Sequence, residues 1–328
     1  MTLSSTRRHM VVWSALALCG LCASAVHAAD AYPNKPIRLV VPYPPGGPTD
    51  IVARVIAQKM QEEMGQTWVV DNRPGAGANL GAENVARSPA DGYTLLVATT
   101  AHAINPSLFS NLSYSLQEDF LPVSQLTSGA LVIVANPSLP VEDVKGLIAL
   151  AKSKEGGLNF ATSGNGQSTH LAAEMFSAMA GVKMNHIPYK GSAPALSDVV
   201  AGHADLMFDT LLSATPFIKS GKLKALAVTS AERSASAPDI PTIAEAGLPG
   251  YEAIAWNGIL APAGTPAEVI EALNAGLKKV LESADVKDRF ASQGFAATWN
   301  SPADYKQFLN NEISTWAQVV KDSGARVE

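Results

Sequence analysis

Three glycine-rich loops hold the residues best suited to binding chemistry, and each follows a predicted strand and opens a predicted helix. They are PPGG at 44–47, GAGA at 75–78 and SGNGQS at 163–168. In an open α/β sheet, ligands bind outside the carboxyl ends of strands, where loops lead into helix N-termini. Unpaired N–H groups and the helix dipole favour negative charge at such positions. The loops therefore predict a site for a small neutral or anionic oxygen ligand.

The first loop has two interpretations. One is a cradle for a carboxylate, because rigid prolines stand beside glycines that let the main chain approach a ligand closely. The other is a plain strand-to-helix turn. Asp50, a few residues on, is interpreted as a helix-start residue rather than a ligand contact.

The second loop begins the pattern Gly75-x-Gly77-x-x-x-Gly81, one residue longer than the dinucleotide fingerprint. It follows the second predicted strand instead of the first, which argues against a nucleotide site. No phosphate-loop lysine motif occurs in the sequence. We therefore expect no cofactor.

The third loop adds two hydroxyls, Ser168 and Thr169, at a predicted helix start. These hydroxyls suit an oxygen ligand. His170 is interpreted as a helix-start or packing residue. Ser168 lacks a nucleophile-elbow pattern, so the sequence gives little support to a serine hydrolase.

Two further positions fall at predicted strand ends. Asp209 is a candidate to meet an amine of an amino-acid-like ligand, with capping of the next helix as the alternative. Tyr189, Lys190 and Gly191 end another strand at the expected rim, where Lys190 either offsets an anion or is an ordinary surface lysine. No two histidines beyond the first 28 residues have helical metal-ligand spacing, so we expect no metal site.

The N-terminus has the composition of an export signal. Arg7 and Arg8 precede an almost wholly apolar stretch at 10–21, and Val26-His27-Ala28 resembles a cleavage site. The stretch is short for a bilayer span of about 20 residues, and no later segment is long and apolar enough to serve as an anchor. We interpret 1–28 as a cleaved signal peptide and expect a periplasmic protein with no direct membrane insertion.

Both cysteines, Cys19 and Cys22, lie within this leader. Each follows a leucine where a lipoprotein signal has a small residue, which disfavours lipidation. The cysteine-free remainder suits an oxidising compartment and excludes thiol catalysis and cysteine-ligated metals. The arginine pair loosely resembles a twin-arginine signal, but such pairs are ordinary in Sec leaders, and we favour Sec.

Charge narrows the class of partner. The formal net charge is −5, and the leader contributes two basic and no acidic residues. The mature chain is therefore mildly acidic, which argues against nucleic acid or an anionic membrane surface as a partner. A local site can still oppose the overall sign and bind an anion.

Short β-branched runs alternate with amphipathic stretches along the chain. A strand at 37–41, a helix at 51–64, a strand at 68–70, a helix near 80–87 and a strand at 93–98 predict a largely parallel sheet with helices on both faces. A second such series runs from 130 to 228. The tail is predicted to be mainly helical, with capping-box spacing at 242–245 and 265–268, the latter with proline at the first helical position.

Two α/β series plus a helical return segment predict two lobes with more than one crossing between them. We expect the first lobe to comprise 29–125 and 232–328, and the second to comprise 126–231. About 300 residues suffice for two lobes of ordinary size.

The order of motifs resembles one known family. The runs YPNKPIRLVVPYPPGGPTDIVAR, VVDNRPGAGANLGAENVARSPADGYTLLVAT, HIPYKGSAPALSDVVAGHADLMFD, GKLKALAVTSAERS and PDIPTIAEAGLPGYEAIAWNGILAPAGTP cover nearly the whole mature chain in order. They are similar to the Bug (Bordetella uptake gene) family of extracytoplasmic solute receptors, the substrate-binding proteins of tripartite tricarboxylate transporters. This resemblance implies a periplasmic-binding-protein fold of the Venus-flytrap, type II-like kind, with a ligand cleft between two α/β lobes.

The resemblance also implies which positions contact a ligand, usually a small carboxylate held by main-chain groups, hydroxyls and waters. First-lobe contacts are expected from 44–47, 76–79 and 99–102, second-lobe contacts from 163–169, and rim contacts from 189–191 and Asp209. The candidate ligand-binding residues are Pro44, Pro45, Gly46, Gly47, Ala76, Gly77, Ala78, Asn79, Thr99, Thr100, His102, Ser163, Gly164, Asn165, Ser168, Thr169, Tyr189, Lys190, Gly191 and Asp209.

The implied partners are a small organic anion and the membrane subunits of a tripartite tricarboxylate-type transporter, with the receptor acting as a monomer. Two alternatives stay open. A ligand-sensing receptor for a sensor kinase would use the same cleft. A secreted enzyme would need an acid–base or nucleophilic pair, and we expect no catalytic residues because the sequence offers none.

Overall fold

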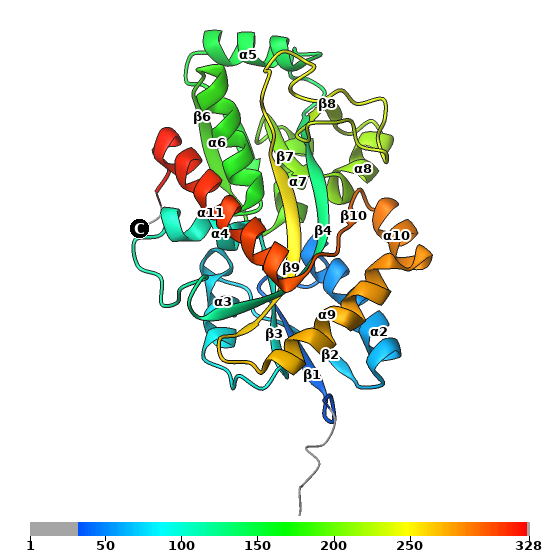
Figure 1. Ribbon diagram of the computed structural model, residues 1–328. Coiled ribbons are helices and arrows are strands. Elements are labelled where there is room, and N and C mark those ends of the chain that lie inside the picture. The colour runs from blue at the N-terminus through cyan, green and yellow to red at the C-terminus, as the bar shows by residue number, and fades with distance from the viewer. Residues whose placement is uncertain (1–31, 327–328) are drawn as a thin grey trace, which may run out of the picture. The chain divides into compact units, whose positions relative to one another are not determined.

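The computed structural model describes residues 32–326, so the predicted signal peptide lies outside the described residues. From Lys35 onward the chain forms one unit, and the described part of it is built on a mixed sheet flanked by helices (Figure 1). None of the helices described there is long and apolar enough to cross a membrane.

The first half of the sheet has three parallel strands followed by two antiparallel ones. In spatial order they are β2, β1, β3, β9 and β4. Their bounds are β1 (Ile37–Val41), β2 (Trp68–Asn72), β3 (Thr94–Thr99), β4 (Phe120–Ala135) and β9 (Ile254–Pro262).

The second half of the sheet continues from the same long strand, β4. Its remaining strands are β5 (Leu158–Thr162), β6 (Met184–Pro188), β7 (Leu206–Thr210) and β8 (Lys224–Val228), with the two-residue β10 (Ala296–Ala297) added to the first half. Strand β4 pairs with β9 as far as Ala130 and with β7 and β8 from Leu131 onward. Strand β4 therefore exchanges β9 for β7 and β8 after Ala130, a few residues beyond the lobe boundary predicted after residue 125.

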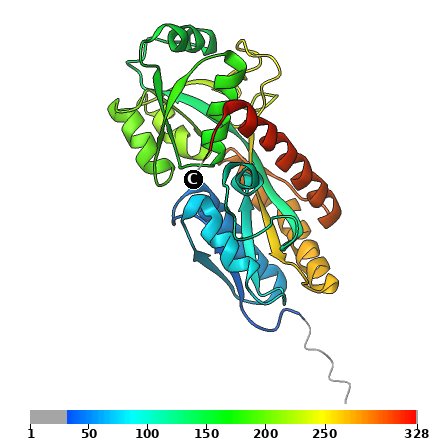
Figure 2. The same cartoon turned by 90° about the vertical axis from the view of Figure 1, so that its left-hand side faces the viewer.

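The helices cover both halves. They are α2 (Pro48–Met64), the short η1 (Ala76–Ala78), α3 (Asn79–Ala86), α4 (Thr100–Leu108), α5 (Val144–Ser153), α6 (Ser168–Ala180), α7 (Ser192–Ala201), α8 (Leu211–Lys219), α9 (Ala267–Glu282), α10 (Ala284–Ala291) and α11 (Pro302–Ser323). Helix α11, red in Figure 2, contacts α4 of the first half and α6 of the second. The C-terminal helix thus connects the two halves.

Apolar spacing explains why these elements form and pack. Val52, Val55, Ile56 and Met60 of α2 are all buried, as the helical period predicts. One cluster of buried apolar residues contains side chains from β1, such as Val40, and from α6 and α11. The halves therefore share part of their core, which limits how freely they can separate.

The prediction was wrong for two strands, the first part of β4 and the whole of β9. The parallel β1–β2–β3 arrangement is confirmed, but β9 and β4 make the whole sheet mixed. The prediction began a strand at Ala130 and missed β9, because Pro122, Asn257 and Gly258 interrupt the apolar pattern. Both strands are long, and they carry the chain from one half to the other.

Two predicted helix starts also differ. Thr242 and Glu245 exchange the capping-box hydrogen bonds, but they close a turn and no helix follows. Helix α9 begins at Ala267 with Pro266 as its N-cap, and the Thr265 hydroxyl donates to the Pro262 carbonyl instead of capping.

Candidate ligand-binding cleft

A cavity of ≈ 580 Å³ lies at the carboxyl ends of strands from both halves of the sheet. Five helices begin at its wall, two from the first half and three from the second. Their N-caps all line it: Gly47 of α2, Thr99 of α4, Gln167 of α6, Gly191 of α7 and Thr210 of α8. Each helix start presents unpaired N–H groups and a partial positive charge. The cavity is therefore suited to a small anion.

Formal charge contributes little to this cavity. Among its lining residues, Lys190 is the one base and Asp209 the one acid. Hydroxyls, amides and backbone supply the remaining polar groups. The lining can thus recognise a ligand through oriented dipoles instead of a guanidinium clamp.

The first glycine loop is fixed by the carboxylate of Asp50. Its Oδ2 accepts from the Gly46 N–H at 2.9 Å and from Arg54 Nε at 2.8 Å, while Oδ1 accepts from Asn72 Nδ2 at 2.9 Å. Burial alone would raise the pKa of Asp50, but the hydrogen bonds from Arg54, Gly46 and Asn72 outweigh it and lower that pKa. Asp50 therefore stays ionised and holds the loop, in agreement with its interpretation as a helix-start residue.

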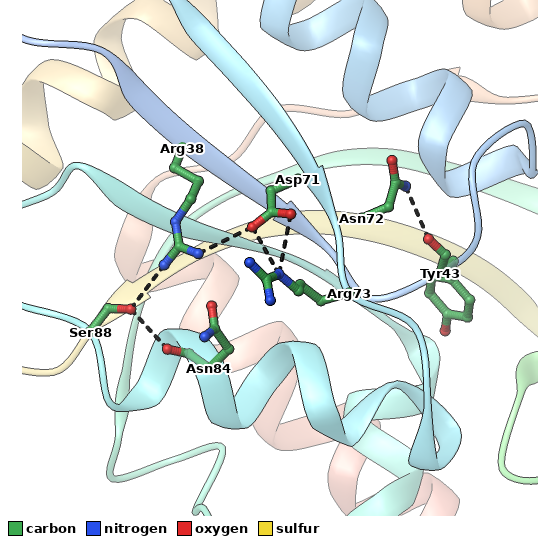
Figure 3. Close-up of polar contacts among 7 residues, drawn as sticks. All are labelled: Arg38, Tyr43, Asp71, Asn72, Arg73, Asn84 and Ser88. Carbon is green, nitrogen blue, oxygen red and sulfur yellow. Dashed lines mark hydrogen bonds and ion pairs between the residues drawn. The ribbon is translucent and has the colours of Figure 1, made fainter.

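Strand β2 supports the same loop from the side. Asn72 Nδ2 donates to the Tyr43 carbonyl at 3.0 Å, where β1 leads into the loop (Figure 3). One step along the strand, Asp71 accepts from Arg38 of β1 at 3.1 Å and from Arg73. Arg38 also donates to Ser88, after α3. Asn72 thus ties the start of the loop to β2, while Arg38 ties β1 to β2 and to the segment after α3.

A phenol bridges the two sides of the cavity. The Tyr43 hydroxyl lies 2.9 Å from Thr99 Oγ1 and donates to Gln167 Oε1 at 2.6 Å. Burial raises the pKa of Tyr43 to about 12, although both hydrogen bonds act in the opposite direction. The phenol therefore keeps its proton at neutral pH.

The third glycine loop is fixed by its own hydroxyls and by a histidine. Thr169 Oγ1 accepts from the Ser163 N–H at 3.0 Å and lies 2.9 Å from Ser163 Oγ. His170 Nδ1 accepts from the Gly166 N–H at 3.3 Å, and its ring stacks on His186 with centroids 3.9 Å apart. His170 packs behind the loop, one of the two roles predicted for it.

Asp209 is the buried acid of the cleft. Its Oδ1 accepts from Ser192 Oγ and from the Thr210 N–H, each at 2.8 Å, while Oδ2 has no partner among the described residues. Burial raises the pKa of Asp209 to about 7, more than these two hydrogen bonds lower it. Asp209 orients the first residue of α7 and lines the cavity, so helix positioning and ligand contact remain compatible roles.

Many of the predicted site residues line this cavity. They are Pro44, Pro45, Gly46, Gly47, Thr99, Thr100, Ser163, Ser168, Thr169, Lys190, Gly191 and Asp209. The others do not: Ala76, Gly77, Ala78, Asn79, His102, Gly164, Asn165 and Tyr189. The structure thus brings together parts of the first and third loops with the start of α4 and the rim, and it leaves the second loop out.

The second loop packs against protein instead. The Gly77 carbonyl accepts from Asn105 Nδ2 at 2.9 Å, and Asn79 Oδ1 accepts from Asn105 Nδ2 at 2.7 Å and from the Tyr114 hydroxyl at 2.8 Å. A Cβ on Gly77 would lie 2.8 Å from Phe109 Cζ. The glycine is needed there because an aromatic side chain approaches the backbone.

Two other predicted residues have supporting positions. His102 completes a capping box on α4 through its Nδ1, which accepts from the Thr99 N–H at 3.0 Å, and burial lowers its pKa to about 4. The Tyr189 hydroxyl donates to Asp198 at 2.7 Å, away from the cavity lining. Both side chains hold elements that carry lining residues.

The candidate residues chosen from sequence omit several polar lining positions. Gln167 fell inside the expected 163–169 contact range but had no role of its own. Tyr43, Ser192 and Thr210 directly adjoin predicted residues, so widening each motif by one position would have found them. Asn257 comes from β9, and without that strand no sequence signal indicated it.

The two-part sheet joined by β4 and β9, with a cavity at five helix N-termini, defines a two-lobed solute-binding protein. Residues 52–325 match the family model described as "Tripartite tricarboxylate transporter family receptor". The chain belongs to this family, as the motif resemblance predicted.

A curated relative supports the assignment along the full chain. Protein BugT of Bordetella pertussis is 38% identical over 328 residues, covering 99% of this chain and 100% of the relative. This similarity includes the N-terminal segment that the structure does not describe.

Solved structures confirm the fold. An R. palustris protein solved with adipate has a TM-score of 0.86 and 38% identity, covering 90% of this chain and 100% of that chain. MatC from Rhodopseudomonas palustris, solved with malate, has a TM-score of 0.82 and 35% identity, covering 88% and 100%. The fold is thus the two-lobed periplasmic-binding-protein type, and these family and structural relatives are substrate-binding receptors.

Proposed function

We propose that this protein is exported to the periplasm after cleavage near Ala28, and that as a monomer it captures a small organic anion, a carboxylate. The loaded form then delivers the anion to the membrane subunits of a tripartite tricarboxylate-type transporter. Adipate and malate, held by two structural relatives, are both carboxylates. The observation that carries the proposal is the convergence of five helix N-termini on one cavity, because their N–H groups stabilise an anion without a salt bridge.

We further propose that binding closes two lobes with the predicted extents, 29–125 with 232–328, and 126–231. A ligand that touches helix starts of both halves makes its full set of contacts only when the halves are close. Its higher affinity for that state shifts the equilibrium toward closure. The membrane partner would then recognise the closed form.

The test is calorimetric titration of the purified mature protein with adipate and with malate. Ser168→Ala removes a hydroxyl of the lining, and we expect about ten- to a hundredfold weaker binding because hydrogen bonds to charged groups contribute about 1.5–3 kcal/mol. Gly46→Leu fills space that the ligand needs, since a Cβ at Gly46 meets no atom within 4 Å.

Matched controls separate binding from folding. Ser314→Ala removes an exposed hydroxyl of α11. Gly65→Leu repeats the positive φ of Gly46, +70° against +82°, in open space away from the cavity. We expect both controls to bind like the wild type. Unchanged affinity in Ser168→Ala and Gly46→Leu would show that the ligand binds elsewhere.

A further inference from the structure

Tyr43 and Gln167 form a side-chain pair across the cleft. Tyr43 follows β1 in the first half, Gln167 is the N-cap of α6 in the second, and their 2.6 Å hydrogen bond connects residues 124 positions apart. Both line the cavity, and Gln167 is 7% exposed. The pair therefore exists only when the two halves lie close together.

The hydrogen-bond donors and acceptors among Thr99, Tyr43 and Gln167 can be assigned one after another. Thr99 Oγ1 accepts from the backbone N–H of His102 in the capping box, and its own hydrogen can go to the Tyr43 oxygen at 2.9 Å or to His102 Nδ1 at 3.4 Å. The Tyr43 hydrogen goes to Gln167 Oε1, because a carbonyl oxygen can only accept. The amide oxygen of Gln167 is thereby fixed.

This assignment determines which way the amide group faces. Gln167 makes no side-chain cap on α6, and its Nε2 has no hydrogen-bond partner in the described part of the chain. Both N–H hydrogens of Nε2 remain to be donated. Because Gln167 lines the cavity, these donors are available to an acceptor inside it.

We propose that Tyr43 turns the Gln167 amide so that its NH₂ group donates to a ligand oxygen, and that the same pair holds the two halves together. Gln167 then has two roles. Its NH₂ group donates to an acceptor on the ligand, and its Oε1 accepts the hydrogen bond from Tyr43 that joins the two halves, which we call the latch. The proposal rests on the proposed function in one respect, that the ligand is a carboxylate. The raised pKa of Tyr43 keeps the latch hydrogen in place at neutral pH.

Two variants separate the two roles. Tyr43→Phe removes the latch hydrogen while keeping the ring. Gln167→Glu keeps an acceptor for Tyr43 but replaces the NH₂ group with a carboxylate oxygen that repels an anion. Tyr251→Phe, which loses a buried phenol hydrogen bond to Ala172, and Gln117→Glu, at an exposed amide, are the matched controls.

Closure is measured without ligand, by the distance between spin labels on the two halves. Val69 of β2 and Met179 of α6 are 48% and 40% exposed, and the mature chain has no cysteine, so Val69→Cys with Met179→Cys gives a unique pair. We expect Tyr43→Phe to shift the distance distribution from that of the wild type toward longer values. Gln167→Glu should keep the wild-type distribution, because its carboxylate still accepts from Tyr43.

Affinity is measured with adipate by calorimetry. We expect about three- to tenfold weaker binding for Tyr43→Phe, and about a hundredfold or more for Gln167→Glu. Wild-type affinity in Gln167→Glu would overturn the ligand contact, and a wild-type distance distribution in Tyr43→Phe would overturn the latch. Failure of adipate and malate to bind the wild-type protein would instead contradict the proposed function, and the label distances would still decide the latch.

Discussion

The first and second glycine loops, 44–47 and 75–78, follow adjacent parallel strands and look alike in sequence. Only the first lines the cavity. A Cβ on Gly46 would meet nothing within 4 Å, whereas a Cβ on Gly77 would lie 2.8 Å from Phe109. One glycine leaves space beside the backbone and the other lets a side chain fill it. A glycine pattern alone therefore does not distinguish a binding loop from a packing loop.

The two loops also differ in what fixes them. The ionised carboxylate of Asp50 holds the first loop, with Arg54 and Asn72 as its partners. Neutral groups of Asn79 and Asn105 hold the second. The first loop therefore depends on a charge, and the second on buried neutral hydrogen bonds.

The largest effect is expected at Asn79. Asn79→Ala leaves the Tyr114 hydroxyl without its acceptor and removes one of two acceptors of Asn105 Nδ2, in buried surroundings. We expect the free energy of unfolding to fall by about 2–4 kcal/mol, measured by urea denaturation. Adipate affinity of the folded protein should stay within about twofold of the wild type, because Asn79 lies outside the cavity lining.

Glu83→Gln, on the same helix, is the control for this experiment. It removes a partly exposed ion pair with Arg87, and ion pairs near the surface contribute about 0–1 kcal/mol. If Asn79→Ala weakened adipate binding but left the free energy of unfolding unchanged, the second loop would belong to the binding site, and the contrast between the loops would fail.

Much of the fold follows from local patterns. The alternation of apolar strands and amphipathic helices predicted β1, β2 and β3 and the parallel pairing of the first series. It failed for β9 and the first part of β4, where Pro122, Asn257 and Gly258 disrupt the pattern. Those strands owe their structure to long-range pairing with each other and with β3 and β7, which a local pattern does not contain.

The site was predictable where a motif directly adjoins a strand end. The helix starts at Gly47, Thr99 and Gly191 line the cavity because the carboxyl ends of strands meet there. The second loop also follows a strand end, but it does not line the cavity because the end of α4 and the third loop cover it. This covering depends on tertiary packing by Phe109 and Asn165. The Tyr43–Gln167 bond joins distant segments and has no local signal at all.

A smaller effect is expected from replacing Gly77 of the second loop. Gly77→Ala adds a methyl group at φ +63°, 2.8 Å from Phe109 Cζ, so strain and overpacking together should cost about 2–3 kcal/mol. Gly181→Ala is the matched control, since its φ is +62° and nothing lies within 4 Å. It should cost only about 1 kcal/mol, the strain of an L-residue in the left-handed conformation. Equal losses of stability in the two variants would show that backbone strain alone, and not Phe109, requires the glycine at 77.

The smallest effect tests the charge that holds the first loop. Asp50→Asn keeps the shape but weakens the hydrogen bonds from Gly46 and Arg54, and we expect a loss of about 1–2 kcal/mol at pH 7. The folded-state pKa of Asp50 is lowered from its ordinary value of 3.8. Its stabilisation is therefore fully present above that value and is lost as the pH falls through the folded-state pKa.

The difference in unfolding free energy between wild type and Asp50→Asn should consequently shrink below about pH 4. Urea denaturation at pH 7, 5, 4 and 3 measures it, with Asp288→Asn, at an exposed position of α10, controlling for the loss of one negative charge. A difference that stayed constant down to pH 3 would mean that the hydrogen-bond geometry, and not the ionised carboxylate, fixes the first loop. The two glycine loops would then be held by the same kind of interaction, and only their neighbours would set them apart.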